Sequence, residues 1–222
     1  RVSGVRIRND LELVFSEACS PAILRRLNDL GLLAAIAPGL LWDAWLEERF
    51  REAQDFTPPP AWQLALPRGP EPLLYALWLL RRPPAEADRI AERLRFPQWM
   101  RRAIRHAQTL VSHPALQDPV SRPSQIYDAL QGAAPEALVA AWLGAPVDST
   151  VRRAIDAYLA RWRRTAALMT GNDLRRIGVP PGPLYRQILT RLREARLDGL
   201  VSTREDEERF LHRALEDASR RG

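Results

Sequence analysis

Arginine side chains are the groups in this sequence with the clearest potential to bind a ligand. All 33 basic residues are arginines, and 27 aspartates and glutamates leave a formal net charge of +6. Between Glu92 and Asp118 there are five arginines and no acidic residue. The guanidinium fork matches phosphate geometry, so this distribution favours a polyanionic partner. The absence of lysine also indicates a compositional bias, so the positions of the arginines carry more weight than their number.

Other chemistries have weaker support in the sequence. The three histidines, His106, His113 and His212, do not show the spacing of a helical zinc site, and we expect no metal ligand among them. Cys19 is expected to be a small buried residue, and a single cysteine excludes a disulfide framework. The longest nearly apolar run, residues 31–42, is too short to span a bilayer. These features predict a cytoplasmic protein without a membrane partner.

The seven tryptophans are expected to fill the core rather than to stack on nucleic-acid bases. Trp78, Trp99, Trp142 and Trp162 all fall within or at the start of apolar helical stripes. A Trp in such a stripe is more often a core residue than a binding platform. The sequence therefore gives no reason to assign any of the four to a ligand site.

Helical periodicity runs through almost the whole sequence, so helices must position the arginines. Ser3 is a plausible N-cap for a helix over residues 2–15, and Ser20-Pro21 begins a second helix that ends at Gly31. Further helices are predicted over residues 97–112, 151–169 and 183–197, the middle one being the longest. No segment of alternating β-branched residues competes. The sequence predicts an all-α protein, an irregular array of helices without a sheet.

A rigid turn precedes the predicted helix over residues 183–197. Residues 178–183 read GVPPGP, which places Pro183 in the first turn of the helix and Gly182 immediately before it. The first N–H groups of a helix lack internal partners, so such an end can hold a phosphate. The alternative, that Gly182 only shapes the turn by adopting a positive φ, remains open at this stage.

Two motifs near the ends of the chain resemble one enzyme family. Residues 1–13 (RVSGVRIRNDLEL), 27–33 (LNDLGLL) and 36–38 (IAP) are similar to the neck and the start of the body of bacterial class II tRNA nucleotidyltransferases. These are the CCA-adding enzymes and their poly(A) polymerase relatives. Residues 169–183 (MTGNDLRRIGVPPGP), together with 188–192 (ILTRL), 197–199 (LDG) and 203–205 (TRE), resemble the tail of the same family.

The resemblance implies an order of segments along the chain. Residues 1–40 correspond to a neck remnant and the start of the body, 41–168 to a helical body, and 169–222 to a helical tail. Val5 departs from the family, which usually has Glu at this position. Arg6 and Asp10 of the neck motif keep the spacing of an i, i+4 ion pair.

The family's catalytic head has no counterpart in this sequence. Nucleotidyl transfer needs carboxylates that hold Mg²⁺ beside a triphosphate, usually presented from a sheet with a glycine-rich loop. The chain has neither, and it begins with Arg1 rather than methionine. We therefore expect part of a longer enzyme, whose upstream head adds CMP or AMP to an RNA 3′ end with Mg²⁺. We assign no catalytic residue to this chain and expect it to be inactive alone.

The resemblance implies that this part of the enzyme binds tRNA or another structured RNA for the absent head. The alternative is a non-catalytic helical module that binds protein. The residues predicted to contact RNA are arginines on the predicted central helices and around the turn before residue 183, together with one glycine of that turn. They are Arg101, Arg102, Arg105, Arg152, Arg153, Arg161, Arg163, Arg164, Arg175, Arg176, Gly182 and Arg186.

Overall fold

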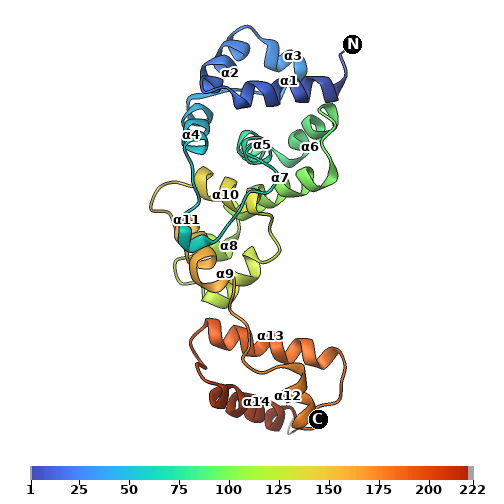
Figure 1. Cartoon of the computed structure of the whole chain (residues 1–222), viewed down its shortest axis with the longest axis vertical. Coiled ribbons are helices and arrows are strands. Elements are labelled where there is room, and N and C mark those ends of the chain that lie inside the picture. Colours follow the sequence, from blue (N-terminus) through green and yellow to red (C-terminus); the bar gives the residue numbers. More distant parts are fainter. Residues whose placement is uncertain (1, 220–222) are drawn as a thin grey trace.

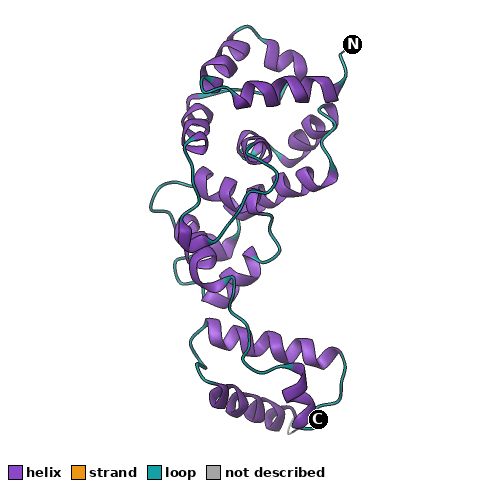
Figure 2. Cartoon of the chain, viewed as in Figure 1, coloured by secondary structure: helices purple, strands orange, loops and turns teal. Residues whose placement is uncertain are grey.

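The computed structural model describes residues 2–219 of the chain, with side chains for residues 2–213. Helices and loops make up all of this range, without a strand (Figure 2), which confirms the predicted all-α fold. The helices fall into a large unit, from α1 to η2, and a small unit, from α12 to α14 (Figure 1).

The large unit contains eleven α-helices, one 3₁₀ turn (η1) and one π-helical turn (η2). They are α1 (Gly4–Ser16), α2 (Ser20–Asp29), α3 (Leu32–Ile36), α4 (Ala44–Gln54), η1 (Pro60–Trp62), α5 (Glu71–Leu79), α6 (Pro84–Arg93), α7 (Gln98–Val111), α8 (Pro114–Gln117), α9 (Pro123–Leu130), α10 (Pro135–Gly144), α11 (Thr150–Ala157) and η2 (Tyr158–Trp162). The helices of the small unit are α12 (Gly171–Arg176), α13 (Pro183–Leu197) and α14 (Arg204–Ser219).

Helix α5 lies at the centre of the large unit, surrounded by α4, α7 and α10 (Figure 1). Apart from Glu71 at its start, α5 has no charged residue, and residues 72–79 are all buried. A helix that is apolar on every side can only be stable inside a protein, so the other helices must cover it.

An aromatic cluster joins α5 to α1 and α4. Phe15, Trp42, Phe50, Tyr75 and Trp78 are each less than 10% exposed and meet edge to face, with ring centroids 4.7–6.1 Å apart. The Trp78 indole N–H donates to the Leu41 carbonyl at 2.9 Å, so its polar atom is satisfied in the core. This cluster fixes the N-terminal helices on the rest of the large unit.

The small unit has its own core of six aliphatic side chains, contributed by all three of its helices and the segments between them. They are Met169, Leu174, Val179, Ile188, Leu192 and Leu211. Local sequence signals start two of these helices. Thr170 and Asp173 form a capping box on α12, and the hydroxyl of Thr203 accepts from the Asp206 N–H at the start of α14.

Helix α13 connects the two units at its C-terminal end. Leu197 joins the core of the large unit, and the Arg193 guanidinium lies 4.5 Å from the centre of the Tyr127 ring. The Asp198 carboxylate accepts from both the backbone N–H and the hydroxyl of Ser124, each at 2.8 Å. Asp198 thus caps α9 from a position 74 residues away, and this contact orients the small unit on the large one.

Three local predictions differ from the structure. The helix predicted over residues 151–169 as the longest ends at Trp162 with a π-helical turn, just before Arg163 and Arg164 donate to Gln63, and α14 with 16 residues is longer. Cys19 is exposed, not buried, and lies in the turn before α2. Trp99 is 38% exposed, since it stands in the first turn of α7 and points away from the apolar stripe. Trp78 is buried as predicted.

Candidate nucleic-acid interface

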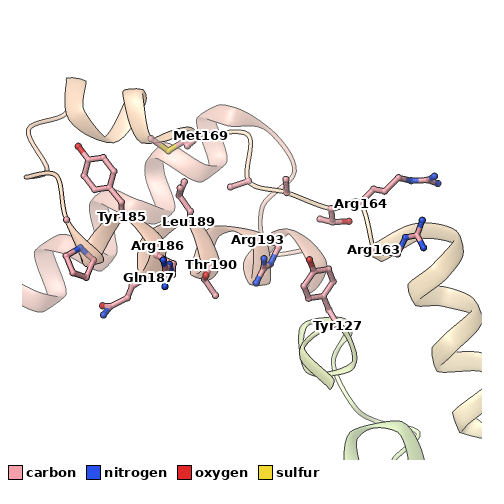
Figure 3. A pocket seen from close by; sticks show the side chains of 15 residues that line it. Tyr127, Arg163, Arg164, Met169, Tyr185, Arg186, Gln187, Leu189, Thr190 and Arg193 are labelled. Carbon is pink, nitrogen blue, oxygen red and sulfur yellow. The ribbon is translucent and has the colours of Figure 1, made fainter. Parts of the chain in front are cut away.

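A cleft of about 1090 Å³ lies between the two units. Helix α13 forms one wall, Tyr127 of α9 lies beside its C-terminal half next to Arg193, and residues 163–167 with Met169 close the remaining side (Figure 3). Four of the residues that line the cleft are charged, and all four are arginines. They are Arg163, Arg164, Arg186 and Arg193.

Three of the four cleft arginines are held by contacts with other residues. Near the end of η2, the Arg163 guanidinium donates to the Gln63 carbonyl at 3.1 Å, and Arg164 donates to the side-chain oxygen of Gln63. Arg193 stacks on Tyr127, and Figure 3 shows the two side by side. Arg186 is exposed on the first turn of α13 and has no ion-pair partner among the described side chains. These contacts hold positive charge along the cleft without neutralising it.

Aromatic and aliphatic side chains line the rest of the cleft. The Tyr185 hydroxyl donates to the Val179 carbonyl at 2.9 Å, which fixes the ring beside the turn before α13. Tyr127 supplies a second ring, next to Arg193. Guanidinium groups next to aromatic rings can bind a phosphate and also stack on a base or sugar, so the cleft has the chemistry of an RNA-binding surface.

The turn before α13 has the shape that the sequence predicts, with one difference. Gly182 is exposed and has a φ of 164°, which is extended backbone open to any residue. A Cβ at this position would meet no atom within 4 Å. The alternative that Gly182 supplies a positive φ is therefore wrong. The glycine with left-handed backbone is Gly178, whose φ of 82° ends α12.

The structure removes Arg152 from the candidate RNA-binding residues. Its side chain is 9% exposed, and its guanidinium donates to the carbonyls of Ala145 and Leu143 at 2.9 and 3.1 Å. It also pairs with Glu52 at 3.2 Å and lies 4.3 Å from the centre of the Trp142 ring. The guanidinium is therefore occupied inside the protein, where it donates to carbonyls at the C-terminal end of α10.

The arginines of α7 are only partly available. Arg105 forms a two-point ion pair with Asp88, and the Nε of Arg101 donates to the Phe96 carbonyl. Arg102 is exposed without an ion-pair partner among the described side chains. The contacts of Arg101 and Arg105 reduce the charge that α7 presents, and their role in RNA binding stays a prediction.

The remaining predicted arginines are exposed but scattered. Arg153 donates to the Asp148 carbonyl at 2.7 Å, and Arg161 lies 5.7 Å from the Trp162 ring. Arg176 pairs with Asp173 at 2.5 Å, while Arg175 is exposed beside it on α12. None of these four lines the cleft, so the structure does not bring them together with Arg186.

The predicted neck pair does not form. Arg6 and Asp10 are both exposed on α1, and no ion pair joins them within residues 2–213. Arg8 instead pairs with Glu12 at 3.4 Å and donates to the Arg95 carbonyl at 2.8 Å. Arg8 and Glu12 therefore lie on the side of α1 that faces the rest of the large unit. Arg6 and Asp10 lie on the solvent side.

Sequence analysis did not select Arg193, Tyr127 or Tyr185. Tyr127 and Arg193 are 66 residues apart, and only the docking of α13 on α9 brings them together. Tyr185 could have been found, because it follows the turn that carries the family resemblance. No sequence signal points to the other two.

Two kinds of structure are absent from the described part of the chain. It contains no group of three or more His, Cys, Asp or Glu side chains placed to hold a metal ion. None of its helices combines the length and apolar character needed to cross a membrane.

Comparison with known proteins shows one enzyme class repeatedly. The A-adding tRNA nucleotidyltransferase of Geobacter sulfurreducens is 28% identical over 230 residues, which cover 98% of this chain and 26% of the relative. A CCA-adding enzyme solved with ATP matches 98% of the chain and 52% of its own length, with a TM-score of 0.73 and 18% identity. The Thermotoga maritima CCA-adding enzyme in complex with tRNA matches 96% of the chain and 52% of its own, with a TM-score of 0.72 and 17% identity. No protein-family model matches the chain.

The chain spans about a quarter of that sequence relative and about half of the solved structures. The structural likeness is at low identity and describes the fold, and the sequence match extends over almost the whole chain. Together they confirm the resemblance that the two end motifs predict: this chain is similar to one part of a tRNA nucleotidyltransferase.

Proposed function

We propose that this chain is the RNA-binding part of a tRNA nucleotidyltransferase or poly(A) polymerase family enzyme. In this proposal it holds a structured RNA, tRNA above all, so that the 3′ end reaches a catalytic head of the same protein. The observation that carries the proposal is the cleft between the two units, whose charged lining consists of four arginines. The fold, shared with a CCA-adding enzyme solved in complex with tRNA, supports it.

Recognition in such a cleft would depend on the RNA backbone. The deep, narrow major groove of A-form RNA hides the base edges, so phosphates, 2′-hydroxyl groups and helix shape are what side chains can contact. Arg186 and Arg164 stand at opposite ends of the cleft and can each contact a phosphate. Because Asp198 fixes α13 on α9, the fold sets the distance between these two contacts. The cleft can therefore select RNAs whose phosphates have the matching separation.

The nucleotidyl transfer itself is proposed for residues outside this chain. A head domain with Mg²⁺-binding carboxylates would add CMP or AMP to the RNA that the cleft holds. The chain's own contribution in this account is to orient the RNA and to limit which RNAs can bind.

The proposal is tested by measuring tRNA affinity as a function of salt for the double variant Arg164→Gln/Arg186→Gln. Each lost phosphate contact lowers the log–log salt slope by roughly 0.7 to 0.9, so we expect a decrease of about 1.5 for the pair. The control is Arg26→Gln/Arg89→Gln, which removes the same charge from exposed positions on α2 and α6. Thermal denaturation shows whether each variant is folded.

Two outcomes would contradict this function. An unchanged tRNA affinity of the folded cleft variant at low salt would exclude the cleft from RNA binding. Equal losses for the cleft and control variants would indicate attraction by net charge alone. In either case the arginines would be solvated surface, as in the alternative of a protein-interaction module.

A further inference from the structure

A second hollow with a positively charged lining lies in the large unit, away from the cleft. Its volume is about 320 Å³, and three exposed or half-buried residues on one face of α7, Trp99, Arg102 and His106, form its base. Their spacing of three and four residues places them on one side of the helix. Arg68, from the loop before α5, and the loop before α10 form the walls.

Trp99 is the feature of this hollow that core packing does not explain. Its side chain is 38% exposed, whereas Trp78 and Trp62 are at most 2% exposed. The Arg68 guanidinium lies 4.6 Å from the centre of the Trp99 ring, within the range of a cation–π contact. The Arg68 guanidinium thus covers one face of the Trp99 indole, and the two flat groups form a stacked layer at the surface.

A buried carboxylate holds Arg68 in this position. Glu136 is fully buried in the first turn of α10, and its Oε1 lies 3.4 Å from the Arg68 Nη1. The other oxygen, Oε2, has no hydrogen-bond partner among the described residues. A buried carboxylate depends strongly on its cation, so Arg68 is the group that compensates Glu136. The layer of Arg68 on Trp99 is preorganised before any ligand arrives.

The charges that line the hollow are all positive. Arg102 has no ion-pair partner among the described side chains, Arg68 is 46% exposed, and no acidic residue is part of the lining. An anion that enters would meet two guanidinium groups and the His106 ring. A ligand with a flat ring in addition could stack on the layer of Arg68 and Trp99.

We propose that this hollow binds one unpaired nucleotide of the RNA, an inference that rests on the proposed function. The base stacks on the layer of Trp99 and Arg68, and the phosphate binds Arg102. The volume falls at the lower end of the range for small-molecule sites, which suits a single nucleotide rather than a duplex. Base stacking tolerates any base, so the site favours single-stranded RNA without reading its sequence.

The first test uses AMP as the probe and the whole chain as the protein. The indole N–H signals are followed by NMR during the titration, and Trp99→Phe assigns the Trp99 signal. We expect a saturable shift of this signal with a millimolar Kd and a weaker one, by roughly fivefold, with ribose 5-phosphate. Arg102→Gln should weaken AMP binding in a folded protein. The proposal is overturned if AMP causes no saturable shift, or if ribose 5-phosphate and AMP bind equally well.

The second test compares a single-stranded RNA with a duplex of the same length. Trp99→Ala should lower the affinity for the single strand by roughly tenfold and that for the duplex by less than about twofold, while Trp99→Phe restores most of the loss. Leu13→Ala, at an exposed position on α1, is the control. Equal effects of Trp99→Ala on both RNAs would overturn the proposal.

The two proposals fail in different ways. If AMP shifts the Trp99 signal but the cleft variants bind tRNA as well as the wild type does, the nucleotide site holds and the proposed function is wrong. If the cleft variants bind tRNA more weakly and AMP does not shift the Trp99 signal, the proposed function is supported and the hollow does not bind a nucleotide.

Discussion

The large unit buries Trp78, Phe50 and Tyr75 in one continuous core that extends from α1 to α13, whereas the six buried side chains at the centre of the small unit include no aromatic residue. Polar groups supply part of what the small unit lacks. The Glu207 carboxylate is fully buried and accepts from the backbone N–H groups of Leu168 and Met169 at 2.9 and 2.8 Å. One unit is thus stabilised mainly by apolar burial, and the other depends more on carboxylates that accept hydrogen bonds from the backbone.

Two more carboxylates stabilise the small unit in the same way. Asp173 accepts from the N–H and hydroxyl of Thr170 and pairs with Arg204, and these contacts hold its pKa well below the ordinary value. Backbone N–H groups of Thr203 and Ser202 lower the pKa of Asp206 in the same sense. This difference between the units shows that carboxylates which accept from backbone N–H groups at helix starts can compensate for a small apolar core.

The largest effect is expected from the aromatic cluster of the large unit. Trp78→Ala removes the largest fully buried side chain and leaves a cavity in the packed core, at a cost of about 3 to 5 kcal/mol. Because α1, α4 and α5 share this cluster, the whole large unit should lose stability together. Chemical denaturation followed by circular dichroism measures this. A decrease in the free energy of unfolding below about 1 kcal/mol would show that the aromatic cluster is not the main source of stability of the large unit.

A smaller and more local effect is expected for Glu207→Ala in the small unit. The substitution leaves two backbone N–H groups without their acceptor and removes the ion-pair partner of Arg196, which costs about 2 to 3 kcal/mol. Hydrogen exchange should accelerate at residues 168–169 and across α12, with little change in α5. Glu205→Ala, an exposed residue of the same helix turn, is the control. Equal exchange in both variants would show that Glu207 does not hold residues 168–169 in place.

Acid should unfold the small unit before the large one. Asp173 and Asp206 have lowered pKa values in the folded protein, so their contribution is complete above the ordinary value of 3.8 and is lost as the pH falls below it. Glu47 of the large unit has its pKa lowered by Arg25 in the same sense, but it lies beside a much larger core. NMR signals of α12 and α14 should broaden or shift first between about pH 4 and pH 2. Simultaneous loss of both units would contradict the comparison.

Several of these elements could be predicted from the sequence, because their signals are local. The cap at Ser3, the capping box at Thr170 and the proline turn before α13 each depend on residues within four positions of one another. The end of the helix at Trp162 has no such local signal, and the contacts just beyond it join Arg163 and Arg164 to Gln63, a hundred residues away.

The candidate site was predictable only in part for the same reason. Arg163, Arg164, Gly182 and Arg186 were selected and do line the cleft, but Arg193 and Tyr127 were not. Periodicity shows on which side of a helix a residue lies, but it does not show which helix packs there. Arg152 illustrates this limit, because the carbonyls that bury its guanidinium come from the end of another helix.

The smallest effect is expected at the turn before α13. Gly182→Ala should change the free energy of unfolding by less than about 0.5 kcal/mol, since the backbone is extended and the added methyl group meets no atom. Gly178→Ala, only four residues earlier, should cost roughly 1 to 2 kcal/mol because of its left-handed backbone. Thermal denaturation of both variants measures the contrast. A reversed order would contradict the geometry of the turn.

The most direct test of RNA binding in the cleft is photo-cross-linking from single positions. A photoreactive residue is placed at Arg186 in the cleft or at Arg26 on α2, and each protein is irradiated with tRNA at moderate salt. The account predicts a cross-linked tRNA product from position 186, which excess unlabelled tRNA removes, and little or none from position 26. Cross-linking from position 26 alone, or equally from both positions, would contradict the claim that the cleft between the two units holds the RNA.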